Sequence, residues 1–117
     1  MATIVMAGGG TGGHVLPLLA RSSVDQISIE LAGSHVPPDV LALAGTKSVA
    51  VGVIDVASNR VETPDEVAET IALARRYLPD ERIVCSTNCG MAPMPREVAY
   101  AKLRSLADGA LLASVGL

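Results

Sequence analysis

Two side chains with metal-binding or nucleophilic chemistry, Glu30 and Cys89, are expected at the carboxyl ends of strands predicted over Gln26–Leu31 and Arg82–Thr87. The carboxyl ends of parallel strands form the edge at which α/β folds collect their chemistry. Glu30 has three interpretations: a solvated charge beyond the sheet, an acid that binds a ribose, or a metal ligand. Cys89 is either a functional thiol or a buried reduced one. Its C-x-x-x-C spacing from Cys85 suits neither a disulfide framework nor a redox pair.

A glycine-rich segment near the N-terminus is a third candidate site. It follows a short strand predicted at Thr3–Ala7 and matches G-x-G-x-x-G at Gly8, Gly10 and Gly13, before a helix-like segment over His14–Arg21. Such a loop lets backbone N–H groups and a helix N-terminus approach a phosphate. Glu30 follows at roughly the 20-residue interval expected of a ribose-binding acid. A flexible glycine turn is the alternative interpretation.

The elements that must position these residues alternate between strands and helices. β-branched residues predict a strand, buried on both faces, that ends with Ile54 before Asp55. Thr63-Pro64-Asp65-Glu66 then supplies an N-cap, a proline in the first turn and a capping box, and Pro79-Asp80 ends the helix. The apolar stripe of this helix is Val67, Ile71, Ala74 and Leu78.

Two further helices complete the alternation. A short one is predicted over Asp39–Ala44, with Gly45 as its C-cap. A long one begins at Pro95 and runs through Gly109, with apolar positions at Ala99, Leu103, Leu106, Ala110 and Ala113. A break at Gly109 with a last strand over 110–113 is the alternative. The order β-α-β-α-β-α-β-α predicts a parallel sheet with crossover helices.

The composition excludes several classes of function. A chain of 117 residues is one domain or a piece of one, and its core is built without Phe or Trp. A net charge of −3 argues against binding to nucleic acid. No apolar run reaches the roughly 18 residues of a membrane span, and the N-terminus lacks the pattern of a signal peptide, so we expect a cytoplasmic protein with reduced thiols.

From about Val24 to Leu117 the chain resembles the C-terminal end of the cobalamin-independent methionine synthase family. The matching pieces are VDQISIE, GVIDVASNRVETPDEV, a strand ending in NCGM, and PREVAYAKLRSLADGALLA. The resemblance implies an α/β fold that forms about half of a (β/α)8 barrel, with a small open Rossmann-like sheet as the alternative. It also implies that zinc holds homocysteine as a thiolate, which attacks the methyl group of 5-methyltetrahydrofolate.

Residue by residue, the resemblance implies two zinc ligands, Glu30 and Cys89, and assigns Asp55 and Ser58 to the substrate loop. The latter two could equally cap the turn before Thr63. A catalytic zinc needs three protein ligands.

Two features of the family are absent. Its His-x-Cys pair of further zinc ligands would fall one strand earlier, where this chain reads Val5-Met6-Ala7-Gly8, and Ala57 occupies the slot of its proton-donor histidine. His14 and His35 are the residues that could compensate for the missing ligands.

The first twenty residues carry a different resemblance. AGGGTGGHVLP is similar to the N-terminal glycine loop of the glycosyltransferase that adds N-acetylglucosamine to lipid-linked peptidoglycan precursors. We therefore expect a single partial barrel over residues 1–117 with an atypical glycine-rich unit at 1–23. Half a barrel leaves two exposed edge strands, so we expect self-association, a partner chain that completes the barrel, or closure into a compact sandwich.

Three hypotheses follow for the function. The first is a zinc-dependent methyltransferase fragment that uses homocysteine and methyl-folate. The second is a nucleotide or nucleotide-sugar binding module that uses the glycine loop. The third is a truncated or recombined product that self-associates and catalyses nothing.

Overall fold

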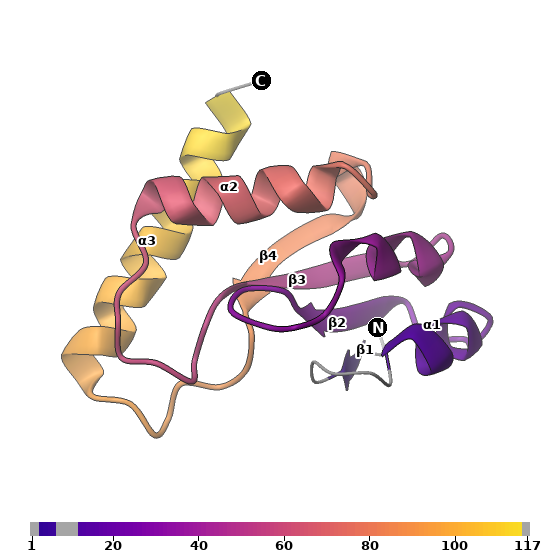
Figure 1. Ribbon diagram of the computed structural model, residues 1–117, viewed down its shortest axis with the longest axis horizontal. Helices are drawn as coiled ribbons and strands as arrows, with labels where there is room; N and C mark the ends of the chain where they lie inside the picture. The colour runs from indigo at the N-terminus through magenta and orange to yellow at the C-terminus, as the bar shows by residue number, and fades with distance from the viewer. Residues whose placement is uncertain (1–2, 7–11, 116–117) are drawn as a thin grey trace.

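The computed structural model of this chain describes residues 3–6 and 12–115. Strands and helices alternate along these residues, as predicted (Figure 1). In chain order the elements are β1 (Thr3–Met6), α1 (Gly12–Ala20), β2 (Gln26–Glu30), the 3-10 helix η1 (Pro38–Ala44), β3 (Ser48–Ile54), α2 (Pro64–Arg75), the 3-10 helix η2 (Asp80–Arg82), β4 (Ile83–Thr87) and α3 (Arg96–Val115).

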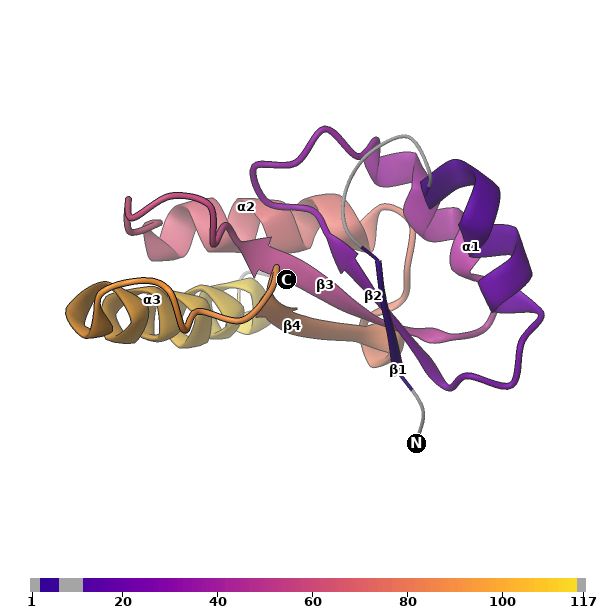
Figure 2. The ribbon, with the colours of Figure 1, turned by 90° about the horizontal axis from the view of Figure 1, so that it is seen from below.

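The four strands form one parallel sheet in the order β1-β2-β3-β4. Each strand pairs with the next one in the chain, and α1 and α2 lie on the same side of the sheet (Figure 2). A Rossmann-like sheet would contain a point at which the strand order reverses. The sequential order is instead that of consecutive strands in a (β/α)8 barrel, which favours the barrel prediction over the Rossmann-like alternative.

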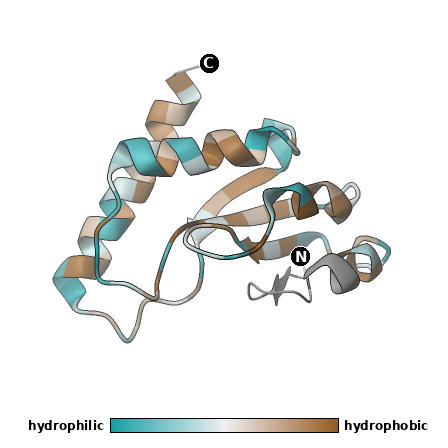
Figure 3. Ribbon diagram, viewed as in Figure 1, coloured by the Kyte–Doolittle hydropathy of each residue, from teal (hydrophilic) through white to brown (hydrophobic). Residues whose placement is uncertain are grey.

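The two faces of the sheet differ in composition. Ile29 of β2, Val51 of β3 and Cys85 of β4 are paired neighbours on the face that packs against the helices. The opposite face carries Glu30 and Gly52, which are paired in the same way. β3 is buried on both faces, as its run of β-branched residues predicted. Hydrophobic residues are concentrated in β2–β4, whereas α2 and α3 alternate between hydrophobic and hydrophilic segments (Figure 3).

The start of α2 is confirmed in detail. The Thr63 hydroxyl accepts the Glu66 N–H at 3.2 Å, the Glu66 carboxylate accepts the Thr63 N–H at 2.8 Å, and Pro64 fills the first turn. The predicted end is wrong, because the helix stops at Arg75 instead of reaching Pro79. The N–H groups of residues 77 and 78 both bond back to the carbonyl of residue 74, which tightens and ends the last turn. All four predicted stripe residues are nevertheless buried.

The remaining helices differ slightly from their predictions. The short helix before β3 is a 3-10 helix, and Gly45 follows it with a positive φ of 65°, as expected of a glycine C-cap. α1 begins at Gly12, two residues before the predicted start. No helix in the described part of the chain is long and apolar enough to cross a membrane.

α3 is continuous through Gly109, so the alternative of a break and a last strand is wrong. A Cβ at Gly109 would overlap the Val67 side chain of α2 and lie 2.9 Å from the Pro64 carbonyl oxygen. Gly109 therefore allows α2 and α3 to cross in close contact (Figure 1). The predicted apolar stripe is wrong at Leu103, which is 43% exposed. The buried positions of α3 are instead Lys102, Ser105, Gly109 and Ala113.

We predict that Gly109→Ala lowers the free energy of unfolding by about 1–3 kcal/mol, because the helices must move apart to relieve the overlap. Helix propensity alone predicts the opposite sign, a gain of up to about 1 kcal/mol. Urea unfolding followed by circular dichroism measures the difference. The control is Ala107→Gly, at an exposed position of the same helix, where only the propensity loss is expected. A Gly109→Ala protein more stable than the parent would contradict the close contact.

Candidate functional site

The predicted functional residues gather at the carboxyl edge of the sheet. Glu30 is the last residue of β2, Asp55 directly follows β3, and Cys89 lies two residues beyond the end of β4. Glu30 is half-buried and Cys89 is exposed. The pairing places Glu30, Gly52 and Ser86 at one level across three neighbouring strands. The structure therefore brings both predicted zinc ligands to one edge, at or just beyond the ends of the two strands that flank β3.

These two residues do not form a complete metal centre by themselves. Among the described residues, no group of three or more His, Cys, Asp or Glu side chains is arranged to hold a metal ion. His35 is exposed and joins no such group. His14 lies in α1, but its side chain is outside the described part of the structure. Glu30 and Cys89 fit zinc in their donor chemistry, yet they supply only two of the three protein ligands that a catalytic zinc requires.

The two cysteines have different surroundings. Both are free thiols, as expected. Cys85 lies within β4 and packs against the core on the helix side of the sheet, where burial raises the pKa of its thiol. Cys89 lies beyond the strand and is exposed. Of the two, only Cys89 is placed to reach a ligand at the carboxyl edge.

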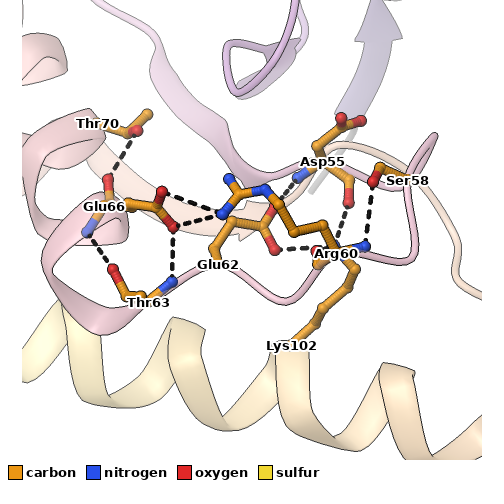
Figure 4. Close-up of polar contacts among 8 residues, drawn as sticks. All are labelled: Asp55, Ser58, Arg60, Glu62, Thr63, Glu66, Thr70 and Lys102. Atoms are coloured by element: carbon orange, nitrogen blue, oxygen red, sulfur yellow. Dashed lines mark hydrogen bonds and ion pairs between the residues drawn. The ribbon is translucent and has the colours of Figure 1, made fainter.

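The loop from Asp55 to Glu62 carries the predicted substrate residues, and its side chains cap its own turns (Figure 4). The Asp55 carboxylate accepts the N–H of Ala57 at 2.9 Å, and the Ser58 hydroxyl accepts the N–H of Arg60 at 3.1 Å. The capping alternative is thus present in the structure. It does not exclude a second role, because both residues also line a cleft.

This cleft has a volume of about 260 Å³ and lies between the ends of β2 and β3 and the start of α2. Its wall is acidic, with four carboxylates and one guanidinium, that of Arg60. Arg60 pairs with Glu66 at 3.1 Å. The hydrogen bond from the Thr63 N–H lowers the pKa of the Glu66 carboxyl most, and the hydrogen bond from Arg60 lowers it further. Ten residues line the cleft, and neither Glu30 nor Cys89 is among them: Ala32, Gly33, Val53, Asp55, Ser58, Arg60, Glu62, Glu66, Glu69 and Thr70.

Lys102 and Glu62 hold the loop in place, although no motif in the sequence singles out either residue. The Lys102 ammonium group is fully buried and donates to the Glu62 carboxylate at 2.8 Å and to the carbonyl oxygens of Asp55 and Arg60 at 2.9 and 2.6 Å. The second Glu62 oxygen accepts the Asp55 N–H at 2.7 Å. The signal that could have revealed the pair is a lysine in helical register with the buried positions Gly109 and Ala113 of α3.

The glycine pattern is largely outside what the structure describes. Gly8 and Gly10 fall in the segment 7–11, and Gly13 is the second residue of α1. The phosphate-binding alternative therefore stays a prediction.

Comparisons with known proteins converge on one family. The cobalamin-independent synthase catalytic domain matches residues 12–111. The methionine synthase of Sulfurisphaera tokodaii is 34% identical over 96 residues, which are 82% of this chain and 28% of that protein. The methionine synthase of Saccharolobus solfataricus is 35% identical over 97 residues, with coverages of 81% and 29%.

A solved structure agrees with these relatives. The B12-independent methionine synthase of a Shewanella species, in complex with selenomethionine, matches with a TM-score of 0.84 and 41% identity. The match covers 86% of this chain and 29% of that one. Because that neighbour is a TIM barrel, the predicted partial barrel is confirmed. The chain thus spans under a third of the length of the relatives it matches.

We predict that Lys102→Met lowers the free energy of unfolding by about 3–5 kcal/mol, because it leaves the buried Glu62 carboxylate without its partner. Lys102→Met combined with Glu62→Leu should recover much of that loss, since neither charge then remains buried. Denaturant unfolding measures both changes, and Arg60→Ala, which removes an exposed ion pair, is the control with a much smaller effect. A Lys102→Met protein as stable as Arg60→Ala would contradict this role of the buried pair.

Proposed function

This chain belongs to the cobalamin-independent methionine synthase family, and we propose that it forms the zinc-binding C-terminal portion of a methyltransferase barrel. The proposed reaction transfers the methyl group of 5-methyltetrahydrofolate to the thiol of homocysteine. The chain supplies two of the zinc ligands, Glu30 and Cys89. Because it spans under a third of its relatives' length, the remaining parts of the site come from other segments.

The observation that carries this proposal is the placement of Glu30 and Cys89 at one edge of the sheet, at the end of β2 and just beyond the end of β4, the two strands that flank β3. A carboxylate oxygen and a thiolate sulfur are both ligands that zinc accepts. Zinc bound there would lower the pKa of a substrate thiol, which makes its sulfur nucleophilic at neutral pH. Cys89 is exposed, so its sulfur is accessible to an ion at this edge.

The missing ligands define what else the site requires. The described residues provide no third donor, and a catalytic zinc needs one more protein ligand and an open position for substrate. We propose that further donors come from a partner chain or a second copy that completes the barrel. Two observations support this proposal: β4 is an edge strand, whose outer backbone groups can pair with a further strand, and Val84, on the face of β4 opposite the helix-packed Cys85, is 45% exposed.

We assign Asp55 and Ser58 to binding polar groups of the substrate. Both line the cleft beside the carboxyl edge, and the Lys102–Glu62 pair fixes the backbone that presents them. The acidic wall of this cleft favours a cationic group over an anion, and the α-ammonium group of an amino acid such as homocysteine is of this kind.

The test is metal analysis and competition titration of the purified chain with zinc, and with cobalt as a spectroscopic substitute. We expect the parent chain to bind metal, with no more than one ion per chain, and to show a thiolate-to-cobalt absorption band. Both should be lost in Cys89→Ser and strongly weakened in Glu30→Gln, because each variant removes one donor. Cys85→Ser is the matched control and should retain the metal. A folded parent chain that binds no metal, or variants that bind it equally well, would overturn the proposal.

A further inference from the structure

Asn88 links three strand ends at the carboxyl edge of the sheet. It follows β4 directly, and its backbone N–H donates to the Ile54 carbonyl oxygen at 2.9 Å. Its side-chain Nδ2 donates to the Ala32 carbonyl oxygen at 2.8 Å, in the segment that follows β2. Ala32 is itself held by β3, because its N–H donates to the Gly52 carbonyl at 2.8 Å. The Asn88 side chain therefore crosses the end of β3 and joins the chain after β4 to the chain after β2.

Gly52 provides the room for this crossing. A Cβ at Gly52 would overlap the Asn88 amide oxygen and lie 2.9 Å from the Asn88 Cα. The register between β3 and β4 shifts immediately after Gly52, so that Ile54 pairs with Thr87. This irregularity changes the direction of the end of β3, as β-bulges beside functional sites do. The glycine and the register shift together let the Asn88 side chain lie over β3.

The Asn88 side chain is buried, with 6% of its surface exposed, and its Oδ1 has no hydrogen-bond partner among the residues that the structure describes. The amide orientation is determined by Ala32, because the opposite orientation would set Oδ1 against a carbonyl oxygen. A buried acceptor without a donor lowers folding stability. A side chain that carries this cost, yet joins two strand ends, has a positioning role rather than a packing role.

The two segments that Asn88 joins are the ones that carry the proposed zinc ligands. Ala32 lies two residues after Glu30, and Asn88 directly precedes Cys89. β2 and β4 flank β3, so their backbones are roughly 9.6 Å apart, which is two strand spacings. Two donors on one zinc ion must lie within about 4 Å of each other. The cysteine side chain is short, so the chain after β4 must bend towards β2 for both ligands to meet.

We infer that Asn88 is a positioning residue of the metal site: its bond to Ala32 holds the Cys89 segment over β3, close enough to Glu30 for both to bind one ion. This inference rests on the proposed function. Gly52 is required for the same arrangement, because any side chain at that position displaces Asn88.

The first experiment compares cobalt affinity in the parent chain, Asn88→Ala and Gly52→Ala, each titrated under conditions where the protein is folded. We expect affinity to fall about tenfold or more in both variants, with a weaker thiolate-to-cobalt band. Ile71→Val is the control, since it removes a buried methyl group from α2 without touching the strand ends. An Asn88→Ala protein that is less stable but binds cobalt within about twofold of the parent would overturn the inference, since outer partners of a metal site normally change affinity by more.

A second experiment needs no metal and separates failure of this inference from failure of the proposed function. In a Cys85→Ser background, Glu30→Cys places a second thiol opposite Cys89, and a short bifunctional thiol reagent reports how close the two segments are. Cross-linking should be severalfold slower when Asn88→Ala is added. An unchanged rate would overturn the positioning role whether or not the parent chain binds zinc. Slower cross-linking in a chain that binds no metal would instead sustain the role of Asn88 and count against the zinc site alone.

Discussion

The buried ion pair between Lys102 and Glu62 is the interaction on which the carboxyl edge of this structure depends. Lys102 projects from α3 into a site without solvent, and its three N–H donors meet one carboxylate oxygen and two backbone carbonyls. The other Glu62 oxygen takes the N–H of Asp55. Every donor of the ammonium group is thus satisfied, which is the condition under which a buried charge is tolerated. The pair therefore determines one arrangement of α3, the loop and the end of β3, and so presents Asp55 and Ser58.

Two glycines each allow neighbouring parts of the fold to approach closely, one between two helices and one at the end of a strand. Gly109 lets α3 approach α2, and this approach places Lys102 of α3 beside the loop. Gly52 lets the Asn88 side chain lie over β3. In both places the missing side chain is used for close approach, since neither glycine has a positive φ. The site is thus built from helix crossing, loop and strand ends together. A side chain added at Gly109 is expected to disturb the contact of α3 with α2, and one added at Gly52 the contact of Asn88 with β3.

Features encoded locally could be predicted from the sequence. The Thr63–Glu66 capping box, the buried strand at Val49–Ile54 and the glycine cap at Gly45 each depend on neighbours within a few residues. The Lys102–Glu62 pair joins residues that are 40 positions apart, and no local pattern selects that partner. The exposure of Leu103 was missed for a related reason: the close contact at Gly109 restricts the buried face of α3 to a narrow line, which the hydrophobic pattern alone does not reveal.

The residues of the candidate site could be predicted from the sequence, whereas the contacts that arrange them could be predicted only in part. The sequence and the family resemblance pointed to Glu30 and Cys89, and the parallel strand order brings them to one edge. The Asn88 link was not foreseen, because it requires a register shift that only the paired strands define.

X-ray absorption of the zinc-loaded chain would show directly whether Cys89 and Glu30 hold the metal ion. We expect one sulfur neighbour at about 2.3 Å with oxygen or nitrogen neighbours at about 2.0–2.2 Å, and loss of the sulfur in Cys89→Ser. Zinc surrounded by oxygen alone, as expected for an ion in the acidic cleft beside Glu66 and Glu69, would contradict it.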